Sequence, residues 1–574
     1  MEYAALVDVY DKLFAASKRL EKTRILAQFL KDQKAVQPHL FHMIRGRVFP
    51  DWDETNIGFA ARTAVKAISI ASGISLSQIE HLWKEHGDLG IAAEHAMTKK
   101  RQSTLFTQSL NVDKVYANLR KIAEQEGQGS VTNKVRLVTE LLSCADSRQA
   151  KYIIRTLLED MRIGIGDSTI RDSIIWTCFD VVDITEKDAT IADRETYTKI
   201  QERVQEAYDI TNDWSEVFSK AREGISHLET IKLKVGRPVK VMLFPKAVDI
   251  EDAFNRVGKP CAFEYKYDGF RVEIHKQGET VTLYTRRLDN VTAQFPDVVE
   301  VVKTFVSAEA CILDAEIIGI ASDKSYIPFQ EISQRIKRKH GIEDMAKNLP
   351  VELNIFDILY HDTPCLKIPF SKRRAILEKI VTCKKGKIML AEQIITDDEK
   401  EVQAFFEKSI ALSNEGLMAK SLDAEYRPGA RVGYGVKLKV VKESLDLVIV
   451  KAEHGEGKRA GWFTSFTVAC MDEEGDLLEI GKVSTGLKEK DEEGVSFKRL
   501  TELLKPLILT ENGKTVIVKP RIIIEVGHEE IQKSSSYASG YALRFPRFLK
   551  LRDDKPLDEV TTIDYIEKLY KEQI

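Results

Sequence analysis

Apolar residues in the first part of the chain recur at the spacing of amphipathic helices, three or four positions apart among charged and polar residues. The pattern begins with Leu6, Val9, Leu13, Leu20, Ile25, Leu26, Phe29 and Leu30. Similar stretches, separated by Gly or Asp, continue to about residue 220. We therefore predict that residues 1–220 form an all-helical domain.

The helical period gives way to a stretch rich in valine and containing proline at residues 228–246, where we place a linker. Residues 221–440 then mix both periods and predict an α+β domain. Its expected strands are 281–284, 312–318 and 353–358, and one expected helix is 371–381. Residues 441–574 are dominated by strands, which predicts an all-β domain built as a small barrel. The expected strands there are 445–450, 463–469, 477–483 and 521–526.

The stretch Glu-Tyr-Lys-Tyr-Asp-Gly-Phe-Arg, which begins at Glu264, is the strongest candidate for chemistry. In a strand, Glu264 and Lys266 share one face. The Asp-Gly pair predicts a tight hairpin turn, in which glycine accepts a positive φ, and this turn brings Lys266 close to Arg271. A lysine crowded by another cation loses part of its preference for the charged form, and only the neutral amine attacks an electrophile. Lys266 is thus a candidate covalent nucleophile, with an exposed lysine beside an ordinary turn as the alternative.

Composition narrows the class of protein. The 574 residues, 43% of them hydrophobic, suffice for about three or four domains. The 86 basic and 89 acidic side chains leave a formal net charge of −3, so a surface for nucleic acid must be local. Seven cysteines without C-x-x-C spacing indicate reduced thiols and argue against disulfides or structural zinc. No apolar run approaches the roughly 18 residues of a membrane span, and we expect a soluble, cytoplasmic protein.

Polar side chains alternate with apolar ones on two further predicted strands. Asp314 and Glu316 lie opposite Leu313 and Ala315, and two carboxylates on a buried-looking strand require a cation or hydroxyl donors. Farther along, Lys437 and Lys439 alternate with valine and leucine, so both ammonium groups face one way. These positions favour a charged site built on strands.

Arginines follow other predicted strands. Arg286 comes directly after the strand at 281–284, and a guanidinium fork suits phosphate or ribose oxygens. Arg544 and Arg547 flank a Phe-Pro pair in the last domain. Exposed arginines at the surface of a strand are the alternative in each case.

Two segments of the helical domain also attract attention. Gln102, Leu105 and Phe106 follow a basic cluster, and a loop that anchors its own apolar side chains in the core is the plain explanation. Residues 155–171 predict that one helix ends at glycines and that another starts at an Asp/Ser/Thr cap. Glycines at a helix N-terminus suit a phosphate, whereas simple helix punctuation is the alternative.

Taken together, these segments resemble the ordered motifs of the covalent nucleotidyltransferases, a superfamily of ATP-dependent DNA ligases, RNA ligases and mRNA capping enzymes. The resemblance is closest to the three-domain DNA ligases of archaea and eukaryotes, and it covers essentially the whole chain. It implies an all-α DNA-binding domain at 1–220, an α+β adenylation domain at 221–440 and an OB-fold domain at 441–574.

The resemblance also implies roles for individual residues, with ATP and Mg²⁺ as cofactors. Lys266 is the expected nucleophile, Glu316 and Glu415 the expected metal ligands, and Arg544 and Arg547 the expected groups that orient pyrophosphate. The expected nucleotide-binding residues are Glu264, Arg271, Arg286, Glu316, Phe356, Arg431, Lys437 and Lys439. For Phe356, expected to stack on adenine, a place in the core is the alternative.

The sequence departs from the family at Gly435, where these ligases usually have tryptophan. The departure predicts a more open wall of the nucleotide site at this position. It also leaves the choice of nucleotide as a point to be tested.

In the helical domain the resemblance assigns a sliding-clamp contact to Gln102, Leu105 and Phe106. It assigns contacts with duplex DNA to the segment that contains Arg162, Gly164 and Gly166. The expected partners are thus nicked duplex DNA and a sliding clamp, with the protein itself a monomer.

The implied function is the sealing of nicks in DNA through a lysyl-AMP intermediate, in replication, repair, recombination and cell division. An RNA ligase or another nucleotidyltransferase is the nearest alternative, although such enzymes mostly lack a large helical domain ahead of the lysine. A non-catalytic nick sensor or clamp adaptor is the alternative from a different class. A kinase is not expected, because H-R-D-x-x-x-x-N and Walker A sequences are absent.

Overall fold

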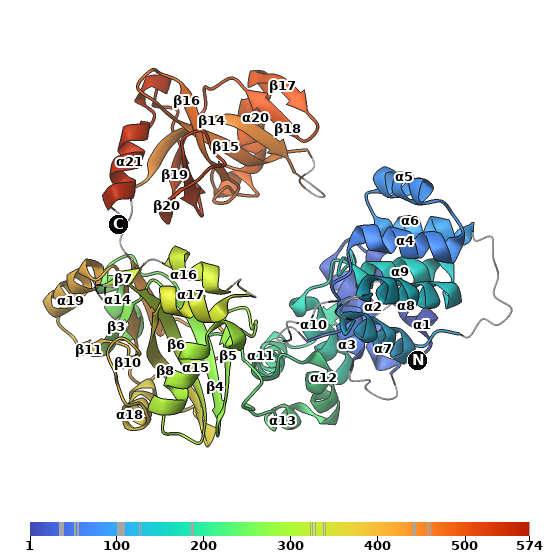
Figure 1. Cartoon of the computed structure of the whole chain (residues 1–574), viewed down its shortest axis with the longest axis horizontal. Coiled ribbons are helices and arrows are strands. Elements are labelled where there is room, and N and C mark those ends of the chain that lie inside the picture. Colours follow the sequence, from blue (N-terminus) through green and yellow to red (C-terminus); the bar gives the residue numbers. More distant parts are fainter. Residues whose placement is uncertain are drawn as a thin grey trace. The chain divides into compact units, whose positions relative to one another are not determined.

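The computed structural model describes most of the chain. The described residues are 1–33, 39–50, 53, 55, 57–99, 109–125, 127, 129–184, 189–321, 323, 325–327, 329–336, 338, 340–439, 443–455, 459 and 461–572. This described part divides into two compact units, Met1–Leu438 and Lys439–Ile574. Figure 1 colours the chain from blue at the N-terminus to red at the C-terminus.

The blue to teal part of Figure 1 is helical, as predicted. Its helices are α1 (Tyr3–Ala15), α2 (Arg19–Lys31), α3 (Leu40–Ile44), α4 (Ala61–Ser72), α5 (Leu76–His86), α6 (Leu89–Thr98), α7 (Val112–Ala123), α8 (Ser130–Cys144), α9 (Ser147–Leu157), α10 (Asp167–Cys178), α11 (Arg194–Thr211), α12 (Trp214–Glu223) and α13 (Ile225–Leu228). One antiparallel pair, β1 (Val182–Ile184) and β2 (Ala189–Ile191), interrupts the helices. α13 ends at Leu228, within the stretch where the sequence predicted the linker.

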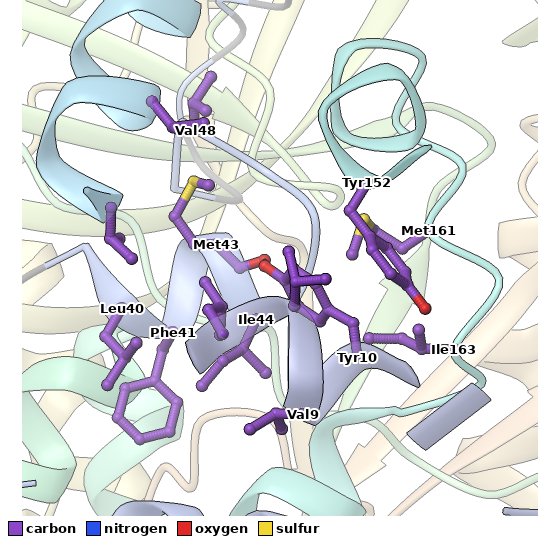
Figure 2. Packing of buried hydrophobic residues seen from close by; sticks show 14 of the residues in the cluster. Val9, Tyr10, Leu40, Phe41, Met43, Ile44, Val48, Tyr152, Met161 and Ile163 are labelled. Carbon is purple, nitrogen blue, oxygen red and sulfur yellow. The ribbon is translucent and has the colours of Figure 1, made fainter. Parts of the chain in front are cut away.

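The core of the helical region holds segments that are far apart in the sequence (Figure 2). The Tyr10 hydroxyl donates to the Met43 carbonyl at 2.6 Å, and the rings of Tyr10 and Tyr152 lie 4.8 Å apart. Met161 packs over Gly46 so closely that a Cβ there would lie 1.8 Å from its Cγ. Together with the buried Ile163, Met161 therefore anchors the segment that follows α9.

In the described residues between Leu228 and Lys439, the strands form two sheets. The large sheet has the order β10-β8-β6-β4-β5, with β7 beside β6 and β9 beside β8, and the small sheet has the order β11-β3-β12-β13. The strands are β3 (Cys261–Lys266), β4 (Phe270–Gln277), β5 (Thr280–Thr285), β6 (Ala310–Ile320), β7 (Tyr326–Ile327), β8 (Val351–His361), β9 (Thr363–Pro364), β10 (Ile388–Leu390), β11 (Gln393–Thr396), β12 (Gly416–Lys420) and β13 (Gly435–Lys439). The helices are α14 (Ile250–Val257), η1 (Thr292–Gln294), α15 (Pro296–Phe305), α16 (Phe329–Ile336), α17 (Ile342–Asn348), α18 (Phe370–Ile380) and α19 (Glu399–Ala411).

The predicted hairpin at the lysine stretch is wrong. β3 belongs to the small sheet and β4 to the large sheet, so the chain crosses from one sheet to the other at Asp268 and Gly269. Gly269 does not have a positive φ. A Cβ on it would instead lie 2.3 Å from the Ile317 carbonyl oxygen, so glycine is needed there because the crossing passes against β6.

Each sheet buries an apolar face against helices and turns a polar face the other way. Side chains of β4, β6 and β8 pack with α15, α16 and α18, and those of β3, β12 and β13 pack with α14 and α19. The alternation predicted around Glu264 and Lys266 and around Asp314 and Glu316 is present, because their apolar neighbours on each strand belong to these cores and the charged residues do not. Contacts described below join the two polar faces, and we call the place where they meet the inter-sheet site.

The C-terminal unit is rich in antiparallel strands, which confirms the predicted all-β class. Its strands are β14 (Leu445–His454), β15 (Phe463–Met471), β16 (Leu477–Val483), β17 (Ile508–Asn512), β18 (Thr515–Val518), β19 (Ile523–Gly527), β20 (Glu530–Lys533), β21 (Tyr541–Arg544) and β22 (Arg547–Leu551). Its helices are η3 (Asp491–Glu493), α20 (Phe497–Leu504), η4 (Lys505–Leu507), η5 (Leu557–Glu559) and α21 (Ile563–Glu572). Their apolar side chains form a separate core within this unit.

Candidate active site

Lys266 ends β3, where the strand pairs with the start of β12. The pairing sets Lys266 opposite Gly416, and the Glu415 N–H donates to the Lys266 carbonyl at 2.8 Å. As a result, the Lys266 Nζ lies 2.7 Å from the Glu415 Oε2. The small sheet thus supplies both a partly exposed lysine and a carboxylate at one point.

The large sheet supplies a second carboxylate to the same point. Glu316 lies on β6, in register with Arg271 on β4. Burial is the main cause that raises the pKa of the Glu316 carboxyl to about 8. The positive charges of Lys266 and Arg271 lower this pKa, whereas the negative charges of Glu415 and Asp314 raise it. Glu316 therefore senses charges from both sheets, which places it in the inter-sheet site.

Arg271 pairs with Asp314 of its own sheet. The predicted hairpin had instead placed Arg271 beside Lys266. Its Nε donates to the Asp314 Oδ1 at 2.7 Å, and its Nη2 also donates to Asp314 and, at 2.9 Å, to the Tyr426 hydroxyl. The Tyr426 hydroxyl donates to the Asp314 Oδ2 at 2.8 Å. The cation and hydroxyl donor that the buried carboxylates required are therefore present, and Asp314 receives them.

Glu264 is buried and paired on the small sheet. The Lys420 Nζ lies 2.5 Å from the Glu264 Oε2, and the Gln393 Nε2 donates to the Glu264 Oε1 at 2.9 Å. Lys420 also lies 4.9 Å from the centre of the Phe356 ring and 4.6 Å from that of Phe370. The sequence reasoning missed Lys420 and Tyr426. Lys420 could have been found, because it ends the Glu-Gly-Leu-Met-Ala-Lys motif on the face that carries Glu264.

Phe356 lies between cations of both sheets. Arg271 of the large sheet lies 5.3 Å from the centre of the Phe356 ring, and Lys420 of the small sheet lies 4.9 Å from it. The ring is only half-buried, although it packs against the core behind the small sheet. Its position is thus at the rim of that core and within the inter-sheet site.

β13 carries the predicted pair of lysines. Val436 and Leu438 are buried in the core behind the small sheet, so Lys437 and Lys439 point to its opposite face, as the alternation predicted. Arg431 precedes this strand and is exposed, with its backbone bridged to Leu243.

Arg286 comes from the edge of the large sheet. Arg286 follows β5, is exposed, and lines a pocket that does not include Lys266. The other cations that line the pocket are Arg45, Arg47, Lys240 and Arg287. Cations from the helical region and from the end of β5 thus line the same pocket.

In the C-terminal unit, Arg544 ends β21 and its Nη1 donates to the Glu530 Oε2 at 2.9 Å. Arg547 starts β22 and is exposed. Between them Phe545 is 65% exposed at a φ of 50°, an uncommon backbone conformation for a residue with a side chain. The two arginines thus flank a turn that projects an aromatic ring.

The comparisons with known proteins agree along the chain. Residues 2–175 match the family model for the DNA ligase N terminus, 241–439 the model for the ATP dependent DNA ligase domain, and 459–555 the model for the ATP dependent DNA ligase C terminal region. The chain is 46% identical over 579 residues to a DNA ligase of Nanoarchaeum equitans (strain Kin4-M), covering 100% of this chain and 99% of that protein. It is 39% identical over 577 residues to a DNA ligase of Thermococcus fumicolans, covering 99% of this chain and 98% of that protein. The chain belongs to the family of ATP-dependent DNA ligases.

The ligase also shares its fold with a solved structure named Pmar-Lig_Pre, at a TM-score of 0.54 and 14% identity over 95% of this chain and 99% of that one. Membership in the family makes the chain a ligase that uses ATP and acts on DNA. The alternatives of an RNA ligase and a non-catalytic adaptor are not favoured. No helix in the described part of the ligase is long and apolar enough to cross a membrane.

In the helical region of the ligase, the predicted helix ends near Gly164 are partly wrong. α9 already ends at Leu157, and the N-cap of α10 is Gly166, without a side-chain cap. Arg162 and Gly164 both have positive φ, 56° and 61°, and the Arg162 Nε donates to Asp160 at 2.8 Å. The segment is a tight loop with a half-exposed arginine, followed by an uncapped helix N-terminus.

Two further expectations concern the sliding-clamp contact and the metal site. Gln102, Leu105 and Phe106 lie outside the residues that the structure describes. Across the described positions, no group of three or more His, Cys, Asp or Glu side chains is arranged to hold a metal ion by itself.

Proposed function

We propose that this ligase forms a covalent lysyl-AMP at the inter-sheet site and that Lys266 is the nucleophile. One observation carries the proposal: the Lys266 Nζ lies 2.7 Å from the Glu415 Oε2, beside Glu316 from the other sheet. Carboxylates from both sides of the site therefore surround Lys266. The other lysines of the small sheet lie elsewhere, at the far end of β12 and on β13. A partly exposed amine among carboxylates is suited to attack at phosphorus once its proton is removed.

In the first step, the Lys266 amine forms a bond to the α-phosphorus of ATP as the bond to the β-phosphate oxygen breaks. Pyrophosphate leaves with the electron pair of the broken bond. The proton on Lys266 passes to a carboxylate, for which Glu415 is already in contact. AMP then passes to the 5′-phosphate at a nick, and the 3′-hydroxyl displaces AMP to seal it.

Glu316 and Glu415 are suited to a divalent ion such as Mg²⁺. Mg²⁺ is commonly held by one or two carboxylates together with substrate phosphates and water, which is what a pair of glutamates offers. The raised pKa of Glu316 fits this use, since an added cation would favour its charged form. Mg²⁺, when bound, neutralises charge that develops on the phosphates.

Other residues would bind and orient the nucleotide. Phe356 offers a half-buried ring for adenine, and Glu264 and Arg271 are fixed beside it by Lys420 and Asp314. Lys437 and Lys439 share one face of β13 and would meet the phosphates. We assign the same general task to Arg286 and Arg431, which are exposed and would approach the nucleotide when it binds.

The remaining assignments extend the proposal to the whole chain. Arg544 and Arg547 would orient pyrophosphate, and Arg162 with Gly164 and Gly166 would contact the phosphates of nicked duplex DNA. Gln102, Leu105 and Phe106 would bind a sliding clamp. We propose domains at 1–220, 221–440 and 441–574 in a cytoplasmic monomer that serves replication, repair, recombination and cell division.

The test is transfer of label from α-labelled ATP to the protein in the presence of Mg²⁺, followed by addition of nicked DNA. The unchanged protein should retain the label through denaturation and release it as the nick is sealed. Lys266→Ala should remain unlabelled. The matched control is Lys259→Ala, which removes an exposed lysine just before β3 and should label normally. Persistent label on Lys266→Ala would sink the assignment, and discharge by RNA ends alone would overturn the substrate.

A further inference from the structure

The first residue of β13 is a glycine whose side-chain space is filled by another residue. An ideal Cβ on Gly435 would lie 2.6 Å from Cε1, 2.7 Å from Cζ and 2.8 Å from Cδ1 of Phe244. The φ of Gly435 is not positive, so its backbone conformation does not itself demand glycine. Any side chain at position 435 would therefore have to displace the Phe244 ring.

Backbone pairing holds Phe244 beside β13. Lys246 forms a parallel bridge with Lys437. The Lys437 N–H donates to the Pro245 carbonyl at 2.8 Å, and the Ala247 N–H donates to the Lys437 carbonyl at 2.8 Å. These bonds directly follow Phe244 in the sequence, so they fix its main chain beside β13.

The alternation of side chains along β13 shows on which face of the small sheet the Phe244 ring lies. Val436 and Leu438 are buried in the core behind the small sheet. Gly435 and Lys437 therefore belong to the opposite face, which is the face of the inter-sheet site. The ring that covers Gly435 consequently lies on the same side as the lysines of β13.

Phe244 is also connected to the large sheet. It is half-buried against a cluster that contains Met242 and Tyr426. Arg271 donates to the Met242 carbonyl at 3.0 Å and to the Tyr426 hydroxyl at 2.9 Å, and it lies 5.3 Å from the centre of the Phe356 ring. Phe244 is thus connected to Phe356 through Met242, Tyr426 and Arg271.

We propose that Phe244 is a nucleoside-binding residue that forms the wall of the inter-sheet site at Gly435. An aromatic ring offers an apolar face, which suits the ribose and base of ATP and not its phosphates. The family resemblance places tryptophan at 435, and here a ring from the neighbouring segment stands in that space. The expectation of a more open wall at Gly435 is therefore corrected. The proposal rests on the proposed function, because it takes the inter-sheet site to bind ATP.

Exchange of the two residues tests the proposal. Phe244→Ala and Gly435→Trp should each raise the KM for ATP in label transfer to the protein by about tenfold, with little change in kcat. The double variant, with both changes, should return the KM to within about threefold, because the ring is moved and not lost. Phe406→Ala is the matched control, since it removes another half-buried ring from the opposite side of the small sheet. It should lower the melting temperature and leave the KM unchanged.

A second pair guards against failure of Gly435→Trp to fold. Gly435→Ala alone pushes a Cβ into the Phe244 ring and should lower the melting temperature, and Phe244→Ala in the same chain should relieve this loss. Additive effects in both pairs, or a normal KM in Phe244→Ala, would overturn the inference while label transfer by the unchanged protein stands. Absence of label on the unchanged protein would overturn the proposed function, and the inference with it.

Discussion

Lysines predominate on the polar face of the small sheet, beside Glu264, whereas carboxylates predominate on the polar face of the large sheet, beside Arg271. On the small sheet these are Lys266, Lys420 and Lys437, and on the large sheet Asp314 and Glu316. Each sheet is otherwise alike, with an apolar face covered by helices. Charges of opposite sign allow the two polar faces to pack against each other, because buried charges without a partner of opposite sign would be costly.

The same comparison separates charges with a partner on their own sheet from those that meet across the site. Glu264 is paired with Lys420 within the small sheet, and Arg271 with Asp314 within the large sheet. Glu316 differs, because its carboxyl responds to Lys266 and Glu415 from the other sheet. The Glu264–Lys420 and Arg271–Asp314 pairs hold their side chains in place, whereas Lys266, Glu415 and Glu316, which meet at the inter-sheet site, are the charges proposed for chemistry.

The largest effect is expected from the carboxylates that meet across the sheets. Glu316→Gln and Glu415→Gln should each slow label transfer from α-labelled ATP by about 100- to 1,000-fold, because each removes a proposed metal ligand. The two variants should also require more Mg²⁺. The control is Glu309→Gln, an exposed glutamate just before β6. Normal rates and normal Mg²⁺ dependence in both variants would refute a metal site here.

A large effect on stability is expected within the small sheet. Lys420→Met leaves the buried Glu264 with Arg374, 3.7 Å away, as its remaining cation, and should destabilise the protein by about 2 kcal/mol, measured by denaturant unfolding of this region. Replacing both members, with Glu264→Met and Lys420→Met, should recover much of that loss. The exposed Lys246→Met is the control. An unchanged stability of Lys420→Met would show that the pair is not structural.

A smaller effect is expected at the aromatic ring between the sheets. Phe356→Ala should raise the KM for ATP by about tenfold, the equivalent of roughly 1.4 kcal/mol of nucleotide binding. Phe370→Ala is matched, because its ring also contacts Lys420 but is 1% exposed. It should lower the melting temperature more and the ATP affinity less. If the two variants behave in the opposite order, Phe356 belongs to the core.

The last expected effect is a dependence of stability on pH. Burial raises the pKa of Glu316 to about 8 from an ordinary 4.5, so the folded protein holds this proton more tightly than the unfolded chain. The resulting stabilisation is full below about pH 4.5 and is lost as the pH rises through about 8. Between about pH 5 and about pH 9, the melting temperature of the nucleotide-free protein should fall more than that of Glu316→Gln. Parallel curves for the two proteins would contradict the shift.

The sequence alone determined the elements and the faces of the strands that carry charge. The alternation around Glu264, Asp314 and Lys437 is a local property, because successive side chains of a strand point to opposite faces. The same local pattern located β16 at Leu477–Val483 and α18 at Phe370–Ile380. The order of the motifs was enough to indicate the family.

Only the tertiary structure decided which of these faces meet. The Asp-Gly pair resembles a hairpin turn locally, yet β3 and β4 join different sheets because each finds its partners far along the chain. The pairing of Arg271 with Asp314 and the packing of Phe244 over Gly435 follow from the same long-range contacts. Spacing along the sequence does not record such contacts, since they depend on how separate elements pack.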